Sequence, residues 1–221
     1  MCIRDRNKRN INLPVITVAT QVIVDKDDPD FENPVKPIGA YYTEEEAKAL
    51  EKENGYMMKE YKGRGWRRLV ASPFPRKIVE IDAIKDLWNS SIVISCGGGG
   101  IPVVENMDGT LTGVAAVIDK DFAAELLAER VDADILLILT EVEKVALNWG
   151  TEDQKDLDTL TLSEAAKYVE EGHFPVGTML PKVEAAMKFV RTYPNKKAII
   201  TSLDKAIDAL EGKNGTVFTF A

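Results

Sequence analysis

The strongest constraint on the fold is a regular alternation of two kinds of segment, which begins near residue 77 and continues to the C-terminus. Short apolar runs such as SIVISC and ADILLILT have the length and the Ile, Val and Leu content of buried strands. The segments between them have the periodicity of amphipathic helices. This alternation predicts an α/β fold with a mainly parallel sheet that helices cover on both faces.

The pattern gives bounds for each expected element. Helices are expected at 80–90, 121–131, 162–172, 181–193 and 203–212, and strands at 91–96, 133–140, 197–202 and 215–220. Ligands in such folds bind at the carboxyl ends of the strands, so residues that follow strands are the first candidates for a functional site.

The sequence before residue 77 does not show this alternation of strand-like and helix-like segments. Residues 13–24 read as a strand broken by a bend, and 25–76 as a small α/β insertion. Within the insertion, a proline-rich loop precedes a helix that a Thr43–Glu46 capping box opens and Gly55 stops. A hairpin around KGRG follows.

We therefore divide the chain into three parts. Residues 12–24 and 77–221 form the core domain, and 25–76 form a protruding subdomain. Residues 1–11 are a lead-in whose first six residues, MCIRDR, resemble the translated remnant of a sequencing adapter.

Charge and cysteine content restrict the partners. Lys and Arg number 28 against 36 Asp and Glu, and a net charge of −8 argues against nucleic acid or an anionic membrane as the main partner. With only Cys2 and Cys96, the chain reads as a reduced protein of the cytoplasm. No apolar run reaches the roughly 18 residues that a membrane span requires. No metal-ligand spacing or catalytic triad surrounds the single histidine, His173.

The glycine run Gly97, Gly98, Gly99 and Gly100 directly follows an expected strand. Glycine lacks a side chain and weakens regular structure, so four in succession indicate that bare backbone is needed there. Two interpretations remain open at this point. The run is either a sharp turn or a loop whose N–H groups lie against a small anion such as phosphate.

Three lysines occupy positions that local structure does not favour. Lys120 directly precedes the helix expected to begin at Asp121, and Lys182 falls in the first turn of the helix that Pro181 opens. A cation at the positive end of a helix dipole is mildly unfavourable. Lysines at two helix N-termini on one sheet edge would form an anion site, although solvated surface lysines are the alternative.

The third lysine, Lys36, lies between Pro34 and Pro37 in the expected stiff loop, where it could reach a ligand or remain a surface residue. The arginines of GRGWRR form too short a basic patch to indicate nucleic-acid binding in an acidic chain.

Several of these blocks, in this order, resemble the carbamate kinases of the amino acid kinase family. They are NPVKPIG, GRGWRRLVASPFP, ISCGGGGIPVV, GVAAVIDKDFAAELLAE, ADILLILTEVEKV, GTMLPKVEAAMKFV and KAIITSLDKAIDALEG. The resemblance extends from about residue 12 to the C-terminus. It implies an open three-layer αβα sandwich and reversible phosphoryl transfer between ATP and carbamate, through carbamoyl phosphate and ADP.

The resemblance also implies a role for each candidate residue. Lys120 and Lys182 would stabilise charge on the transferring phosphoryl group, and Asp121 would orient both lysines. Lys36 and the glycines Gly97 to Gly100 would contact carbamoyl phosphate. The nucleotide pocket would be lined by Thr140, Val142, Lys144, Val145 and Met179. Mg²⁺ would be held by the phosphates of ATP or ADP, with no metal site on the protein itself.

One departure from the family pattern is large. Nothing here matches the N-terminal strand and GGN-type phosphate loop of the family, so we expect that roughly the first third of the fold is absent and that this chain is a fragment, inactive alone. The parent protein would be a homodimer. The alternatives are an amino acid kinase with another acceptor and a non-catalytic nucleotide-binding short form.

Overall fold

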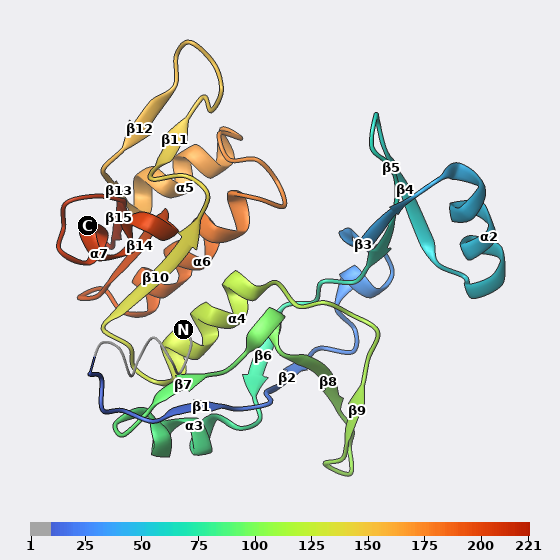
Figure 1. Cartoon of the computed structure of the whole chain (residues 1–221), viewed down its shortest axis with the longest axis horizontal. Coiled ribbons are helices and arrows are strands. Elements are labelled where there is room, and N and C mark those ends of the chain that lie inside the picture. The colour runs from blue at the N-terminus through green and yellow to red at the C-terminus, as the bar shows by residue number, and fades with distance from the viewer. Residues whose placement is uncertain (1–9) are drawn as a thin grey trace. The chain divides into compact units, whose positions relative to one another are not determined.

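The computed structural model describes residues 10–221, so the lead-in motif MCIRDR lies outside the described residues. The chain forms two compact units, one ending at Lys120 and one comprising Asp121–Ala221 (Figure 1). Both units combine helices with parallel and antiparallel strands, which confirms the α/β class. No helix in the described part of the chain is long and apolar enough to cross a membrane.

From residue 10 onward, the N-terminal unit contains three small sheets. In the first, β1 (Val15–Thr17) pairs in parallel with β7 (Ile92–Ile94). The second has the order β6-β2-β8-β9, with β6 (Pro75–Ile78), β2 (Gln21–Val24), β8 (Ile101–Glu105) and β9 (Leu111–Gly113). The bend expected within 13–24 is therefore present between β1 and β2. Helix α3 (Ile81–Trp88) precedes β7 as predicted.

The third sheet belongs to the expected subdomain and has the order β3-β5-β4, with β3 (Lys36–Tyr42), β5 (Gly65–Val70) and β4 (Met57–Tyr61). Its helix α2 (Glu44–Asn54) begins with the predicted capping box, because Thr43 and Glu46 bond each other's backbone reciprocally. Gly55 ends the helix in the left-handed conformation. Figure 1 shows these three strands and α2 grouped together.

The structure corrects the setting of Lys36, which is the first residue of strand β3 and not part of a loop. A short 3-10 helix, η1 (Pro29–Phe31), occupies part of the expected loop before it. Proline disfavours central strands because it lacks the N–H donor. Strand β3 tolerates Pro37 because it is an edge strand that pairs only with β5.

The C-terminal unit has a four-stranded sheet of order β10-β14-β15-β13. Its strands are β10 (Ile135–Thr140), β14 (Lys197–Ser202), β15 (Thr216–Thr219) and β13 (Thr159–Thr161). Pairing is parallel between β10 and β14 but antiparallel between β14 and β15. A hairpin of β11 (Val145–Leu147) and β12 (Lys155–Leu157) extends from this unit.

Helix α6 (Leu180–Thr192) forms the centre of the hydrophobic core in this unit. Its residues Val183, Ala186, Phe189 and Val190 are fully buried and pack in one cluster with side chains of β10, β14 and β15. Helices α4 (Lys120–Arg130) and α5 (Leu162–Glu170) contribute Ala128 and Ala165 to the same cluster. The sequence predicted an amphipathic helix over 181–193, and α6 buries one of its faces in this cluster.

Two predicted helix bounds need correction. Helix α4 begins at Lys120, so this lysine occupies the first turn and does not precede the helix. The helix expected over 203–212 is a 3-10 turn, η3 (Leu203–Lys205), followed by the short helix α7 (Ala206–Leu210).

Candidate active site

The glycine run forms a tight 3-10 turn, η2 (Gly97–Gly99), directly after Cys96. Gly98, Gly99 and Gly100 have positive φ angles of 69°, 104° and 84°, which other residues rarely adopt. A Cβ at Gly99 would lie 2.4 Å from the Ile118 carbonyl oxygen, so this backbone approach requires glycine. The sharp-turn interpretation therefore explains the last three glycines.

The first two glycines of the turn, Gly97 and Gly98, are accessible to a ligand. Gly97 and Gly98 are exposed, and a Cβ at either would meet nothing within 4 Å. The hydrogen bonds within the turn run from the N–H of Gly99 to Cys96 and from that of Gly100 to Gly97, so neither uses the N–H groups of Gly97 or Gly98. These two amides are the part of the run that could contact an anion.

Cys96 at the start of this turn is a structural residue. Its N–H donates to Thr20 Oγ1 at 2.9 Å, and its side chain is 8% exposed. Burial raises the pKa of the Cys96 thiol to about 11. The residue is therefore a protonated thiol at neutral pH and is not a candidate nucleophile.

Lys36 lies beside the backbone segment that the glycine turn contacts. Its Nζ donates to the Ile118 carbonyl oxygen at 3.3 Å and to Asp119 Oδ2 at 3.2 Å. Because Gly99 packs against the same Ile118 carbonyl, these residues form one cluster within the N-terminal unit. The two bonds leave one ammonium proton of Lys36 for a ligand. Asp119, which directly precedes Lys120, was not among the site residues predicted from the sequence.

Helices α4 and α6 run parallel to each other in the C-terminal unit. Their contacts follow the same order along both helices and the turns after them: Asp121 with Lys182, Glu125 and Glu129 with Lys188, the Glu129 carbonyl with Tyr193, and Asp132 with Lys196. Their N-termini therefore lie at the same end, and the positive ends of two helix dipoles point the same way.

This end coincides with the carboxyl edge of the sheet. Only four residues separate α4 from β10, and four separate α6 from β14, so each helix runs antiparallel to the strand that follows it. Strands β10 and β14 are parallel and in register from Ile135 and Lys197 to Thr140 and Ser202. The predicted ligand edge of this unit therefore carries the first turns of both helices.

Lys182 and Asp121 meet at this edge. Lys182 Nζ lies 2.8 Å from Asp121 Oδ2, and the two side chains are 12% and 9% exposed. The structure thus pairs Asp121 with Lys182 and makes Asp121 a first-turn residue whose carboxylate holds a lysine. One ammonium proton bonds Asp121, which leaves two for phosphoryl oxygens. A buried lysine held by one carboxylate is suited to stabilising transferred negative charge.

Lys120 occupies a different environment from Lys182. It is exposed and forms no ion pair in the described part of the chain. Its position in the first turn of α4 still lies at the positive end of that helix, where an anion would be stabilised.

The residues expected at the nucleotide follow β10. Thr140 ends this strand, and Val142 is half-buried in the segment after it. Lys144 Nζ lies 2.5 Å from Asp158 Oδ1. The hydrogen bond and charge of Asp158 raise the pKa of Lys144. Met179 is the residue before α6 and lies half-buried against the core.

Val145 differs from the other residues of this group. Its side chain is fully buried in the core cluster, and its N–H donates to Thr216 Oγ1 at 2.8 Å. The side chain therefore cannot line an open pocket, and any contact with a nucleotide would come from its neighbours.

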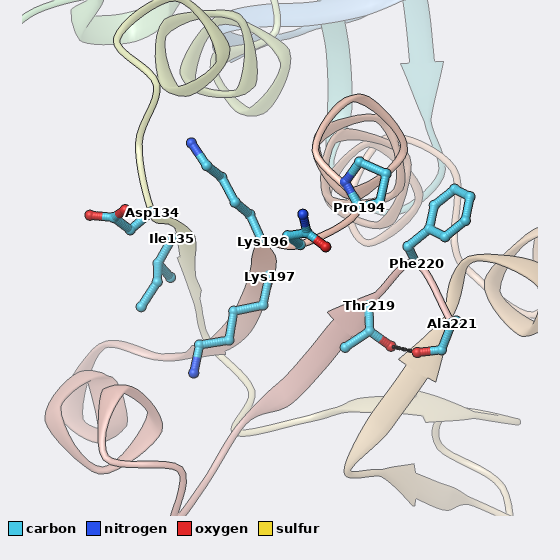
Figure 2. A pocket seen from close by; sticks show the side chains of 9 residues that line it. Asp134, Ile135, Pro194, Lys196, Lys197, Thr219, Phe220 and Ala221 are labelled. Atoms are coloured by element: carbon cyan, nitrogen blue, oxygen red, sulfur yellow. Dashed lines mark hydrogen bonds between the residues drawn. The ribbon is translucent and has the colours of Figure 1, made fainter.

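A cavity of about 740 Å³ lies at the opposite edge of the same sheet. Figure 2 shows Lys196 and Lys197 with Asp134 and Ile135 around it, together with Phe220 of the C-terminal strand end. Ile135 and Lys197 are the first residues of β10 and β14. None of the predicted site residues lines this cavity, so we do not assign the reaction to it.

No three His, Cys, Asp or Glu side chains among residues 10–221 form a group that could hold a metal ion. Each unit supplies a lysine held by an aspartate, Lys36 by Asp119 in the N-terminal unit and Lys182 by Asp121 in the C-terminal unit, and the N-terminal unit adds the backbone N–H groups of the glycine turn. Such a set binds and stabilises phosphoryl oxygens, which is what phosphoryl transfer requires from a protein.

Known proteins with similar sequences identify the family of this chain. The family model described as the amino acid kinase family matches residues 37–202. The chain is 60% identical to the carbamate kinase of Clostridium perfringens over an alignment of 210 residues. This alignment covers 95% of this chain and 67% of that relative.

Solved structures give the same result. A structure from Aeropyrum pernix K1 matches with a TM-score of 0.93 and 44% sequence identity. The match covers 99% of this chain and 70% of the Aeropyrum pernix chain. The carbamate kinase of Giardia lamblia bound to AMP-PNP matches with a TM-score of 0.88 and 43% sequence identity, over 98% of this chain and 68% of the Giardia lamblia chain. The chain spans about two thirds of the length of each relative. It belongs to the amino acid kinase family and, within that family, to the carbamate kinases.

Proposed function

We propose that the protein carrying this chain transfers a phosphoryl group reversibly between carbamoyl phosphate and ADP. The observation that supports this most is the buried Lys182–Asp121 pair at the shared N-terminal end of α4 and α6. The 60% identity to a carbamate kinase supports the choice of substrate. The AMP-PNP complex of the Giardia lamblia enzyme supports ATP and ADP as the nucleotides.

In the proposed reaction, a terminal oxygen of the ADP β-phosphate attacks the phosphorus of carbamoyl phosphate. The bond between phosphorus and the carbamoyl oxygen breaks, carbamate leaves with the electron pair, and ATP forms. Lys182, oriented by Asp121, and Lys120 stabilise the charge on the phosphoryl oxygens in the transition state. Mg²⁺ neutralises charge on the nucleotide phosphates when it is bound to them.

The remaining roles concern binding. Lys36 and the amides of Gly97 and Gly98 would contact carbamoyl phosphate, with Asp119 holding Lys36. Thr140, Val142, Lys144 and Met179 would contact the nucleotide at the carboxyl edge of the C-terminal unit. A cytoplasmic location and a homodimeric parent protein stay predictions of the sequence.

The direct test is ATP formation by the full-length protein that carries this chain. With Mg²⁺, ADP and carbamoyl phosphate, we expect ATP in a coupled luminescence assay, and none when either substrate is omitted. Acetyl phosphate as the donor tests the alternative of another acceptor. Absence of ATP with carbamoyl phosphate would contradict the proposed function, and ATP from acetyl phosphate alone would favour the alternative.

The role of Lys36 leads to a separate expectation. A methionine at this position keeps the apolar stem but removes the charged donor, and hydrogen bonds to charged groups contribute about 1.5–3 kcal/mol. We expect Lys36→Met to raise KM for carbamoyl phosphate by roughly 10- to 100-fold and to leave KM for ADP unchanged. The control is Lys59→Met, which alters an exposed lysine of β4 in the same subdomain. Equal kinetic effects of the two variants would mean that Lys36 is only a surface lysine.

A further inference from the structure

A second ionic cluster joins α4 to α6 behind the Lys182–Asp121 pair. Lys188 Nζ lies 2.6 Å from Glu125 Oε2 and 2.9 Å from Glu129 Oε2. The Glu125 side chain is fully buried, whereas those of Lys188 and Glu129 are 33% and 20% exposed. The proposed reaction does not use any of these three residues.

The residues of this cluster follow the Lys182–Asp121 pair closely along both helices. Glu125 follows Asp121 by four residues, one turn along α4, and therefore lies on the same helix face. Lys188 follows Lys182 by six residues along α6. Because the helices are parallel, one face of α4 receives first Lys182 and then Lys188, although these two lysines leave α6 about 120° apart around its axis. A shift of one helix against the other would disturb both contacts together.

The energetics do not favour this cluster as a simple source of stability. Glu125 Oε1 is buried and has no hydrogen-bond partner among the described residues. Burial raises the pKa of Glu125, although the hydrogen bond and charge of Lys188 oppose this effect. Burial alone would lower the pKa of Lys188, but its bonds to Glu125 and Glu129 outweigh burial and raise it. Well-packed apolar residues in place of a buried ion pair are often equally or more stable.

A buried ion pair does, however, specify register. An apolar contact is satisfied over a range of displacements, whereas the ammonium of Lys188 must remain within hydrogen-bond distance of two carboxylates. Small displacements matter for catalysis, because an error of about 1 Å in a catalytic group can cost roughly 100-fold in rate.

We propose that Glu125, Glu129 and Lys188 are positioning residues, which fix the register of α4 and α6 so that Lys182 reaches Asp121 and the phosphoryl group. This inference rests on the proposed function for its kinetic consequence, but its structural consequence is independent of the reaction.

The structural test uses the double variant Glu125→Leu/Lys188→Met in the full-length protein that carries this chain. We expect its crystal structure to show the Lys182–Asp121 contact lengthened or broken, while the midpoint of denaturant unfolding is unchanged or higher. An unchanged contact, 2.8 Å in the parent sequence, would overturn the inference whether or not the protein makes ATP. If the double variant does not fold, Glu125→Gln is examined in the same way, with the same two outcomes.

The kinetic test is a double-mutant cycle between this cluster and Lys182. We expect Glu125→Leu/Lys188→Met to lower kcat by about 10- to 100-fold, with KM for either substrate changed less than about twofold. In a Lys182→Ala background, the same double substitution should change kcat less than about twofold, because the cluster acts through Lys182. A loss of the same size in both backgrounds would assign the cluster a merely structural role and overturn the inference.

Lys196→Met provides the matched control for both tests. Lys196 also forms an ion pair, with Asp132, between the segments that follow α6 and α4, but it lies at the opposite edge of the sheet. We expect its kcat to stay within about twofold of the parent value. If the unsubstituted protein makes no ATP, the proposed function fails, and the crystal structure of the double variant alone decides this inference.

Discussion

Replacing Lys182 by alanine is expected to lower kcat for ATP formation by about 100- to 1,000-fold. This is the usual effect of removing one preorganised donor from a developing charge, and corresponds to roughly 2.7–4 kcal/mol of transition-state stabilisation. Lys182 is suited to this role because its side chain is 12% exposed and is held by Asp121 at 2.8 Å. Initial rates at saturating carbamoyl phosphate and ADP measure the effect.

The same substitution should also lower the free energy of unfolding. Alanine is a good helix former in the first turn of α6, which by itself favours the variant. However, Asp121, which is 9% exposed, would lose its ion pair with Lys182, and removing one side of a buried ion pair costs about 3–5 kcal/mol. Rates are therefore compared at a temperature at which circular dichroism shows the variant to be folded.

The control for Lys182→Ala is a lysine of similar burial in the same unit. Lys196 is 19% exposed and ion-paired with Asp132, and Lys196→Met should lose stability without losing kcat. If Lys182→Ala and Lys196→Met have the same turnover, Lys182 has no part in the chemistry, and the assignment of this edge as the site of phosphoryl transfer is wrong.

Gly99→Ala is expected to damage both the fold of the N-terminal unit and the binding of carbamoyl phosphate. The new Cβ would lie 2.4 Å from the Ile118 carbonyl oxygen, and the residue would have to keep a φ of 104°. Backbone strain and overpacking together should lower the free energy of unfolding by about 2–5 kcal/mol. Because Ile118 also accepts a hydrogen bond from Lys36, the displacement should raise KM for carbamoyl phosphate at least about tenfold.

Gly97→Ala separates this effect from a general intolerance of the loop. A Cβ at Gly97 meets nothing within 4 Å, and its φ lies outside the positive range. We expect its unfolding midpoint in denaturant to match that of the parent protein. Equal destabilisation by Gly97→Ala and Gly99→Ala would refute the close approach between Gly99 and Ile118 as the reason for the glycine.

Local sequence determined most of the elements. The capping box of Thr43 and Glu46, the stop at Gly55 and the first-turn position of Lys182 were all predicted correctly, because each depends on residues within about one helical turn. Where the sequence prediction failed, a contact with a distant part of the chain had overridden the local preference of the segment. Lys36 lies in a strand and not in a loop because β5 pairs with it along an edge that accepts Pro37.

For the candidate site, the sequence by itself determined which residue types occur and which element ends carry them. Lysines at the N-terminal ends of two helices, a glycine run after a strand and an aspartate beside Lys120 can all be recognised without a structure. The family resemblance then assigned their roles, and the match to the amino acid kinase family confirmed the family.

Only the tertiary structure decided which of these residues meet. Asp121 bonds Lys182 across 61 residues, Lys36 reaches Asp119 across 83, and Glu125 pairs with Lys188 across 63. The last pair was not predicted, because a glutamate in an amphipathic helix ordinarily faces solvent. Each of these distances depends on the register in which helices and strands pack, and packing register follows from the shape of the whole core and not from any local run of residues.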